Sequence, residues 1–351
     1  MEQVLSLLVI TLSLVFAFMN GFHDGSNIVA TTVLSRAIAP RKALLLASIA
    51  EFGGAILLGT AVATSIGNDL FDPMFLHPSS PVASGLVLFS ALAGTILLNV
   101  MTWWVGVPPS STHSIIGGLL GGVVAAQGFG LINWHQVLEL AFIMLAAPFA
   151  GLVIGHFAIS ISSSLFKRSG SSMGEFLKRA HVPCLLFLAA GHGTNNAQKA
   201  MGLITMMLVI SRSLISFEVP LWVFLGCAGA LSLGVYTGGW NIVRILGNRV
   251  FRIDSRHSFV SQLSSGGVML AASLIGGPVS ATEVVKSTVI GVREGSPKKK
   301  VRRRVAREIV IAWIITLPAT AFLSAAIYWT ASGALGEGMG SFETLMSIFG
   351  Q

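Results

Sequence analysis

The sequence predicts an all-α polytopic membrane protein with two inverted-topology repeats, broken helices and two opposed re-entrant helical hairpins. Composition is the first reason, because 53% of the 351 residues are hydrophobic and only 10% are charged. That leaves too few polar side chains for a water-soluble surface. The second reason is that basic residues gather in a few loops. The third is a polar motif that occurs twice inside apolar stretches, where polar groups are costly unless they line a site.

Eight apolar runs have the length or the neighbours expected of membrane helices. They cover residues 4–19, 43–66, 83–105, 137–165, 182–211, 220–243, 258–276 and 309–330. None shows the polar and apolar alternation of a barrel strand, so the spans are predicted to be helical. The first run has no basic segment before it and continues into the first polar motif. We therefore expect a transmembrane helix there and not a cleaved signal.

The 22 Lys and Arg residues concentrate in four loops, with three at 36–42, four at 167–179, four at 244–256 and eight at 293–307. The positive-inside rule places these loops in the cytoplasm and both termini outside. A prokaryotic plasma (inner) membrane is the simplest location. Membrane topology accounts for the formal net charge of +8, so no nucleic-acid partner is expected.

The polar motif indicates an internal duplication. Aligning His23-Asp24 with Asn195-Asn196 gives an offset of 172 residues, and aligning Pro108 with Pro278 gives 170. Such agreement between two separate motifs is typical of a repeat. The first copy precedes a basic loop and the second precedes a loop predicted to lie outside, so the repeats are inverted in the membrane. The predicted units are a first repeat at 1–130, a connecting span and cytoplasmic loop at 131–181, a second repeat core at 182–293, and a basic loop with a final helix at 294–351.

Two segments are predicted to be re-entrant hairpins. Segments 258–276 and 279–292 begin and end at basic loops. At ~1.5 Å per residue, the second of them is too short for a ~30 Å hydrocarbon core. This hairpin would enter from the inside, whereas 83–126, bounded by loops without basic residues, would enter from the outside. Their ends would then meet near the membrane midplane.

The segment 21–27 carries the chemistry of a cation site. Gly21 and Gly25 favour an unwound stretch that frees backbone groups, and the glycines at 191 and 193 favour a second one. A carboxylate and amide carbonyls are suitable ligands for a hard cation. A hydrogen-bonded helix kink is the plainer alternative. The predicted coupling-cation residues are Asp24, Asn27, Asn196 and His23, of which Asp24, Asn27 and Asn196 would hold sodium.

The proline elements carry the chemistry of an anion site. Proline followed by hydroxyl residues starts a helix, whose free amides and positive dipole end can hold an oxyanion. Ser and Thr in such positions often only cap the helix. Lys199 would bind the anion, neutralise Asp24 or extend to the membrane surface. The predicted oxyanion ligands are Ser110, Ser111, Thr112, Ser280, Thr282, Asn195 and Lys199.

Five further polar residues are candidates for the site: Glu51, His113, His192, Gln198 and Glu283. Glu51 would be a coupling group or the partner in a structural hydrogen bond. Glu283 has Lys286 three residues on, so these two side chains would neutralise one another or take part in binding.

At these motifs the chain resembles the inorganic phosphate transporter (PiT) family of cation-coupled symporters. The family's first signature has an Asn-Asp pair after Gly, with an Asn three residues beyond the Asp. Here His23-Asp24 and Asn27 occupy it. The second signature, His-Gly-x-Asn-Asp-Ala-Gln-Lys, is similar to 192–199, and the Pro-x-Ser-Thr-Thr-His elements look like 108–113 and 278–283. Departures are His23 for Asn, Asn196 for Asp, Ala281 for Thr and Glu283 for His.

The resemblance implies inverted repeats with two hairpins, phosphate bound at the centre, and symport with sodium or protons. We therefore expect a secondary active symporter that imports inorganic phosphate with a cation, with sodium slightly favoured over the proton. No cofactor and no enzyme activity are expected. Proton-coupled or metal-phosphate symport, another oxyanion such as sulfate, and an anion channel remain as alternatives. The expected partners are phosphate, sodium or protons and the lipid bilayer, and a homodimer is left open.

Overall fold

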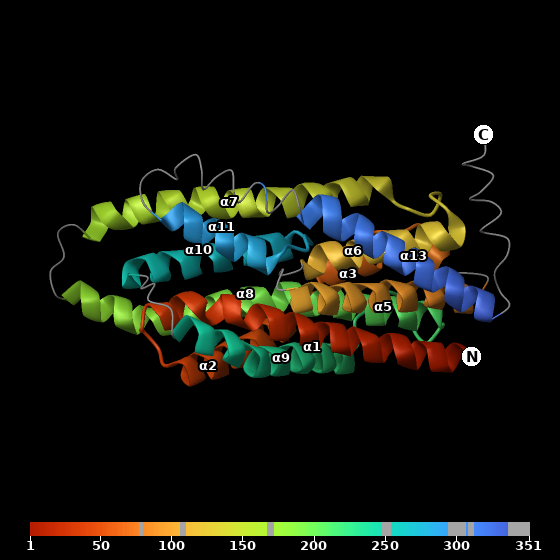
Figure 1. Ribbon diagram of the computed structural model, residues 1–351, viewed down its shortest axis with the longest axis horizontal. Helices are drawn as coiled ribbons and strands as arrows, with labels where there is room; N and C mark the ends of the chain where they lie inside the picture. The colour runs from red at the N-terminus through yellow and green to blue at the C-terminus, as the bar shows by residue number, and fades with distance from the viewer. Residues whose placement is uncertain are drawn as a thin grey trace.

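The computed structural model describes residues 1–76, 80–105, 110–166, 172–247, 254–293, 307 and 312–335, and these form a bundle of helices along one long axis (Figure 1). Within these ranges, five helices are long and apolar enough to cross a membrane, or six if one bent pair counts as a single span. The protein is therefore a multi-span membrane protein, as predicted. The five are α1 (Glu2–Leu34), α5 (Pro81–Val105), α7 (Trp134–Phe166), α9 (Leu221–Gly247), and α13 (Leu317–Ala334) with the preceding π-helical turn η1 (Ala312–Thr316).

A broken helix is present at 58–60, where α2 (Pro40–Leu57) and α3 (Ala61–Gly67) bend by 69°. Gly59 allows the turn with a φ of 87°. The side chain of Gln198 satisfies a backbone group in the break and another at the start of α3. Its Nε2 donates to Gly59 O at 2.7 Å, and its Oε1 accepts from Val62 N at 2.8 Å. The break is thus stabilised from the neighbouring helix α8 (Ser172–Ile210).

The breaks predicted at 21–27 and 191–193 are wrong, because α1 and α8 run through both segments as continuous helices. The glycines serve close helix packing. A Cβ on Gly21 would lie 2.0 Å from Leu231 O of α9, and one on Gly193 would lie 2.2 Å from Glu51 O of α2. Since the helical hydrogen bonds persist, these segments do not offer the freed carbonyl groups that an unwound stretch would supply.

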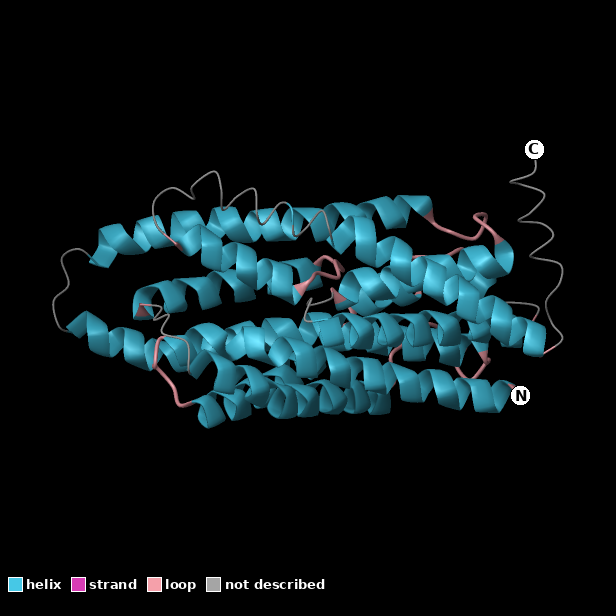
Figure 2. Ribbon diagram, in the orientation of Figure 1, coloured by secondary structure: helices cyan, strands magenta, loops and turns pink. Residues whose placement is uncertain are grey.

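Two antiparallel helix pairs face each other along the long axis. The first pair is α5 with α6 (Ser111–Gln127), and the second is α10 (Ser255–Leu274) with α11 (Ala281–Val292). The first pair lies toward the end that holds the N-terminus and the second toward the opposite end (Figure 1). The loop at 275–280, which joins α10 to α11, lies near the middle of the molecule (Figure 2). It meets the start of α6, where Thr112 Oγ1 donates to Val279 O at 2.9 Å.

Some predicted features lie outside the described residues. They include Pro108 and Pro109 of the first proline element, parts of the basic loops at 167–179 and 244–256, and most of the basic loop at 293–307. Among the described connections, α4 (Pro73–Leu76) follows α3, and residues 71 and 132 form an isolated β-bridge between two loops.

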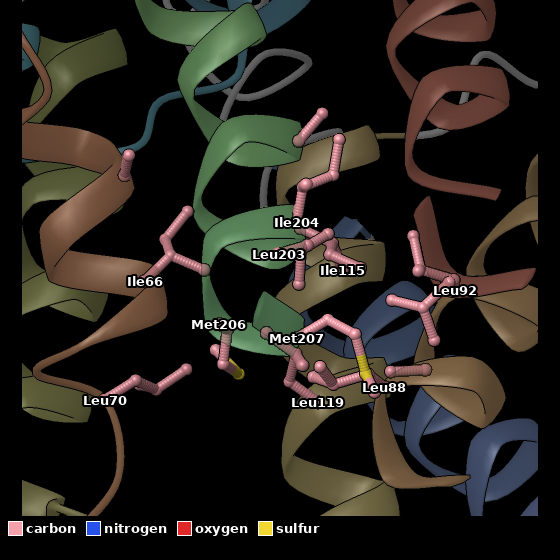
Figure 3. Close-up of a cluster of buried hydrophobic side chains, with 14 of the residues drawn as sticks. Ile66, Leu70, Leu88, Leu92, Ile115, Leu119, Leu203, Ile204, Met206 and Met207 are labelled. Atoms are coloured by element: carbon pink, nitrogen blue, oxygen red, sulfur yellow. The ribbon is translucent and has the colours of Figure 1, made fainter. Parts of the chain in front are cut away.

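The largest hydrophobic core surrounds α8. Figure 3 shows side chains of α3, α5, α6 and α8 meeting there, including Ile66, Leu88, Ile115 and Leu203, which are all fully buried. The outward-facing helix α7 instead leaves Leu138, Phe142, Phe149 and Phe157 exposed. An apolar exposed face of this kind suits contact with lipid tails. The polar residues considered next therefore lie inside an apolar bundle.

Candidate transport site

Asp24, Asn27 and Thr282 form a polar node between α1 and α11. Thr282 Oγ1 donates to Asp24 Oδ1 at 2.7 Å and accepts from Asn27 Nδ2 at 2.9 Å. Asn27 Nδ2 also approaches Asp24 Oδ1 at 3.3 Å. The continuous helix explains this geometry, because side chains three residues apart share a face. The node joins residues 258 positions apart in the sequence and is nearly buried, with Asp24 8% exposed.

His192 connects this node to Glu51. Its Nε2 lies 3.6 Å from Asp24 Oδ2, and its Nδ1 lies 2.8 Å from Glu51 Oε1. Both His192 and Glu51 are completely buried. A carboxylate, an imidazole and a second carboxylate thus follow one another across α1, α8 and α2. Buried charges are tolerated in an apolar bundle when they are paired in this way.

Lys199 and Asn196 form a second polar node on α8. The ammonium of Lys199 donates to Thr112 Oγ1 at 2.6 Å, to Asn196 Oδ1 at 2.8 Å and to Val279 O at 3.1 Å. The amide of Asn196 donates to His192 O at 3.3 Å. Lys199 is fully buried and therefore does not extend to the membrane surface.

Asn195 holds the loop at 275–280 against α8. Its Nδ2 donates to Ser273 Oγ and to Gly277 O, both at 2.9 Å, and its Oδ1 accepts from Val279 N at 3.0 Å. Sequence reasoning missed Ser273 and the backbone of Val279. A hydroxyl in an apolar run was the available signal for Ser273, whereas a main-chain ligand such as Val279 leaves no signal in the residue type.

The N-termini of α6 and α11 carry the predicted hydroxyl ligands. Ser110 caps α6 and shares a short hydrogen bond with the ring of His113, whose Nδ1 lies 3.7 Å from Glu283 Oε1 on α11. Ser280 is the N-cap residue of α11 and makes no side-chain capping bond. Its hydroxyl therefore remains available beside the N-terminal amides of α11. Ser111 is the first residue of α6.

Two predicted site residues lie apart from these nodes. His23, half-buried on α1, stacks on Trp103 with ring centroids 6.2 Å apart and an interplanar angle of 21°. Gln198 is used at the α2–α3 break. The remaining described candidates are brought together where α1, α2, α8, α11 and the start of α6 meet.

A multi-span helical bundle that gathers paired charges, hydroxyls and two helix N-termini at its buried centre belongs to the class of membrane transport proteins. The sequence comparisons define the family. The phosphate transporter family matches residues 20–324, and this chain belongs to that family.

The relatives are similar over nearly their whole length. The chain is 35% identical to the "Probable low-affinity inorganic phosphate transporter" of Bacillus subtilis, and the aligned region covers 93% of this chain and 97% of that protein. It is 36% identical to the protein of the same description in Rhizobium meliloti, with coverage of 92% and 95%. The fold is also that of a solved structure, "The sodium-dependent phosphate transporter", at a TM-score of 0.83, 23% identity and coverage of 94% and 99%. The prediction of a phosphate transporter family member is confirmed.

Proposed function

We propose that this protein is a secondary active symporter that imports inorganic phosphate together with a cation, sodium being slightly favoured over the proton. The observation that carries the proposal is that the starts of α6 and α11 meet through the bond from Thr112 to Val279, while Thr282 of α11 is bonded to the carboxylate of Asp24. A phosphate site and a cation site in contact allow each ligand to stabilise the other. The family match and the names of the relatives support phosphate as the substrate.

The phosphate site lies between the starts of α6 and α11. Free amides and the positive ends of two helix dipoles favour an oxyanion there. The hydroxyl of Thr112 donates to Val279 O, so arriving phosphate exchanges this bond for a bond to one of its own oxygens. Ser280 makes no capping bond and is the first donor to consider. The proposed ligands are Ser110, Ser111, Thr112, Ser280 and Asn195, and Lys199 acts through its charge. Thr282, also predicted as a phosphate ligand, is assigned to the cation site because its hydroxyl donates to Asp24.

The cation site centres on Asp24 and Asn27. Because α1 keeps its main-chain hydrogen bonds, the ligands are side-chain oxygens, and the hydroxyl of Thr282 adds a third one. Asn196 is also predicted as a sodium ligand, but its carbonyl oxygen is bonded to Lys199, so we leave it out of the proposed sodium set. His23 is also predicted as a coupling-cation residue, but its ring stacks on Trp103 apart from this node, so we leave it out of the proposed set.

The proposed architecture is a pair of inverted repeats, 1–130 and 182–293, joined through 131–181 and followed by 294–351. The opposite directions of the two helix pairs support it, since each would be a re-entrant hairpin from its own side (Figure 1). We place the α1–α2 connection, which holds Arg36, in the cytoplasm. The N-terminus and the end of α13 lie at the other end of the bundle, so both termini would be outside (Figure 1).

Proton coupling is the second candidate, and one observation favours it. His192 lies between two buried carboxylates, and such a chain of titratable groups is a typical proton relay in transporters. Proton coupling would leave the phosphate site unchanged and would alter only the driving ion.

Uptake of labelled phosphate by proteoliposomes, under sodium and proton gradients imposed separately, tests the proposal. We expect a sodium gradient to drive accumulation, and Asp24→Asn to abolish it because the only charge of the cation node is lost. Asp254→Asn is the matched control, since that carboxylate is 63% exposed at the start of α10. Equal accumulation of phosphate in sodium-free buffer under a proton gradient would mean that protons drive uptake. Flux that never accumulates phosphate against its gradient would indicate a channel.

A further inference from the structure

The ammonium of Lys199 is held in an oxygen cage, formed by Thr112 Oγ1, Asn196 Oδ1 and Val279 O at 2.6, 2.8 and 3.1 Å. The three oxygens come from three different elements: α6, α8 and the loop between α10 and α11. An ammonium has three N–H donors, and each one has an acceptor here. The donor capacity of Lys199 is therefore fully used by the protein itself.

The chemistry of the oxygen cage is that of a cation site. A buried ammonium is costly unless it is paired, and the usual partner is a carboxylate. Here all three acceptors are neutral oxygens: a hydroxyl, an amide carbonyl and a main-chain carbonyl. Proteins replace the hydration shell of monovalent ions with oxygens of the same kind.

The position of the oxygen cage gives it a role in the transport cycle. Thr112 belongs to the start of α6 and Val279 to the loop before α11, so the ammonium joins the two helix pairs at the proposed phosphate site. The link also includes the direct bond from Thr112 to Val279. A positive charge at this point stabilises an anion between the two helix starts, as a bound metal cation would.

We propose that Lys199 is a tethered resident cation, whose ammonium occupies the oxygen cage in place of one mobile cation of the transport cycle. The inference rests on the proposed cation-coupled symport and adds a residue that sets the number of cations carried per phosphate. Because the ammonium is covalently attached, it stays with the protein while the Asp24 site loads and releases its ion. Asn196 then binds this tethered cation.

Two substitutions of Lys199 separate this role from others. Lys199→Ala empties the oxygen cage and leaves room for a mobile cation, whereas Lys199→Met fills it with a neutral chain of similar length. Lys42→Ala, the same change at an exposed lysine near the start of α2, is the control and should behave as wild type. Phosphate binding is measured on the purified full-length protein, with labelled phosphate at increasing ammonium chloride or sodium chloride and with choline chloride as the ionic-strength control.

We expect Lys199→Ala to bind phosphate about tenfold more weakly than wild type, because the positive charge between the two helix starts is lost. Ammonium or sodium should restore its binding along a saturable curve, and choline should not. Lys199→Met should lose binding without any restoration. In proteoliposomes, the ratio of labelled sodium to labelled phosphate should be higher by one ion in Lys199→Ala than in wild type. Equal, unrestored losses in the two variants, or an unchanged flux ratio, would overturn the proposal.

A change at Asn196 tests the inference without emptying the oxygen cage. In Lys199→Ala, the added Asn196→Asp should lower the cation concentration needed for half-maximal restoration, because a carboxylate then faces the mobile ion. If Lys199→Ala does not fold, the single variant Asn196→Asp in the presence of Lys199 tests the proposal. Its new carboxylate should pair with the ammonium of Lys199, so the sodium concentration for half-maximal uptake should stay unchanged. A shifted half-saturation would mean that a mobile ion binds at Asn196 and would refute the tethered cation. Wild-type protein without cation-driven uptake would instead refute the proposed symport.

Discussion

Replacing Thr282 by Val removes the hydroxyl that joins Asp24 to Asn27 and keeps the shape of the side chain. In the structure this hydroxyl donates to the carboxylate at 2.7 Å and accepts from the amide at 2.9 Å. A hydrogen bond to a charged group contributes about 1.5–3 kcal/mol. Its loss corresponds to a change of about 10- to 150-fold in an equilibrium constant. Because the hydroxyl proton is committed to Asp24, we expect the change in sodium binding.

The assay is initial-rate phosphate uptake into proteoliposomes, with sodium and phosphate varied independently. Thr282→Val should raise the sodium concentration for half-maximal uptake by at least about tenfold, as the lower bound of that estimate. The phosphate concentration for half-maximal uptake, measured at saturating sodium, should change much less. Thr282→Ser is the matched control, because it retains the hydroxyl and should stay near the wild-type sodium dependence.

The opposite pattern would refute this reasoning. If Thr282→Val raised the half-saturating phosphate concentration and left the sodium dependence unchanged, the hydroxyl would serve phosphate. The bond to Asp24 seen in this conformation would then break before the ions load.

Two more predictions concern packing and topology. Gly238→Ala should lower the thermal midpoint of the detergent-solubilised protein, because the added Cβ would lie 2.1 Å from Phe22 O and overpacking typically costs about 1–3 kcal/mol. Gly229→Ala is the control and should leave the midpoint unchanged, because a Cβ there has nothing within 4 Å. Equal midpoints in the two variants would contradict close glycine packing of α1 on α9. An impermeant thiol reagent applied to intact cells should label Gly130→Cys, which the proposed topology places outside, and not Lys42→Cys, which it places in the cytoplasm. The native Cys184 and Cys227 are buried and should not react. Labelling of position 42 from outside would contradict the proposed orientation.

The glycine segments show where sequence reasoning failed. Gly21 and Gly193 were expected to unwind their helices, yet both lie in continuous helix and admit a neighbouring backbone. A glycine permits both outcomes, because its missing Cβ allows unusual dihedral angles and also close approach. Only the packing partner decides between them. The break at 58–60 depends likewise on Gln198, about 140 residues away in the sequence, whose side chain replaces the lost backbone partners.

The role of Lys199 could not be read from its position on α8 either. The sequence left it as an anion ligand, a partner of Asp24 or a surface-seeking side chain. The structure surrounds its ammonium with three neutral oxygens, one of them a main-chain carbonyl. Main-chain ligands depend on how two segments meet and are independent of residue type.

The sequence by itself determined that this protein is a helical, multi-span membrane protein of the phosphate transporter family, since hydropathy and short motifs are local properties of the chain. It also identified most of the polar residues that lie at the buried centre, because uncompensated polar groups in apolar stretches are costly. Only the tertiary structure decided how they pair: Asp24 with Thr282, and His192 between Asp24 and Glu51. These contacts join residues up to 258 positions apart, and each depends on the packing of whole helices.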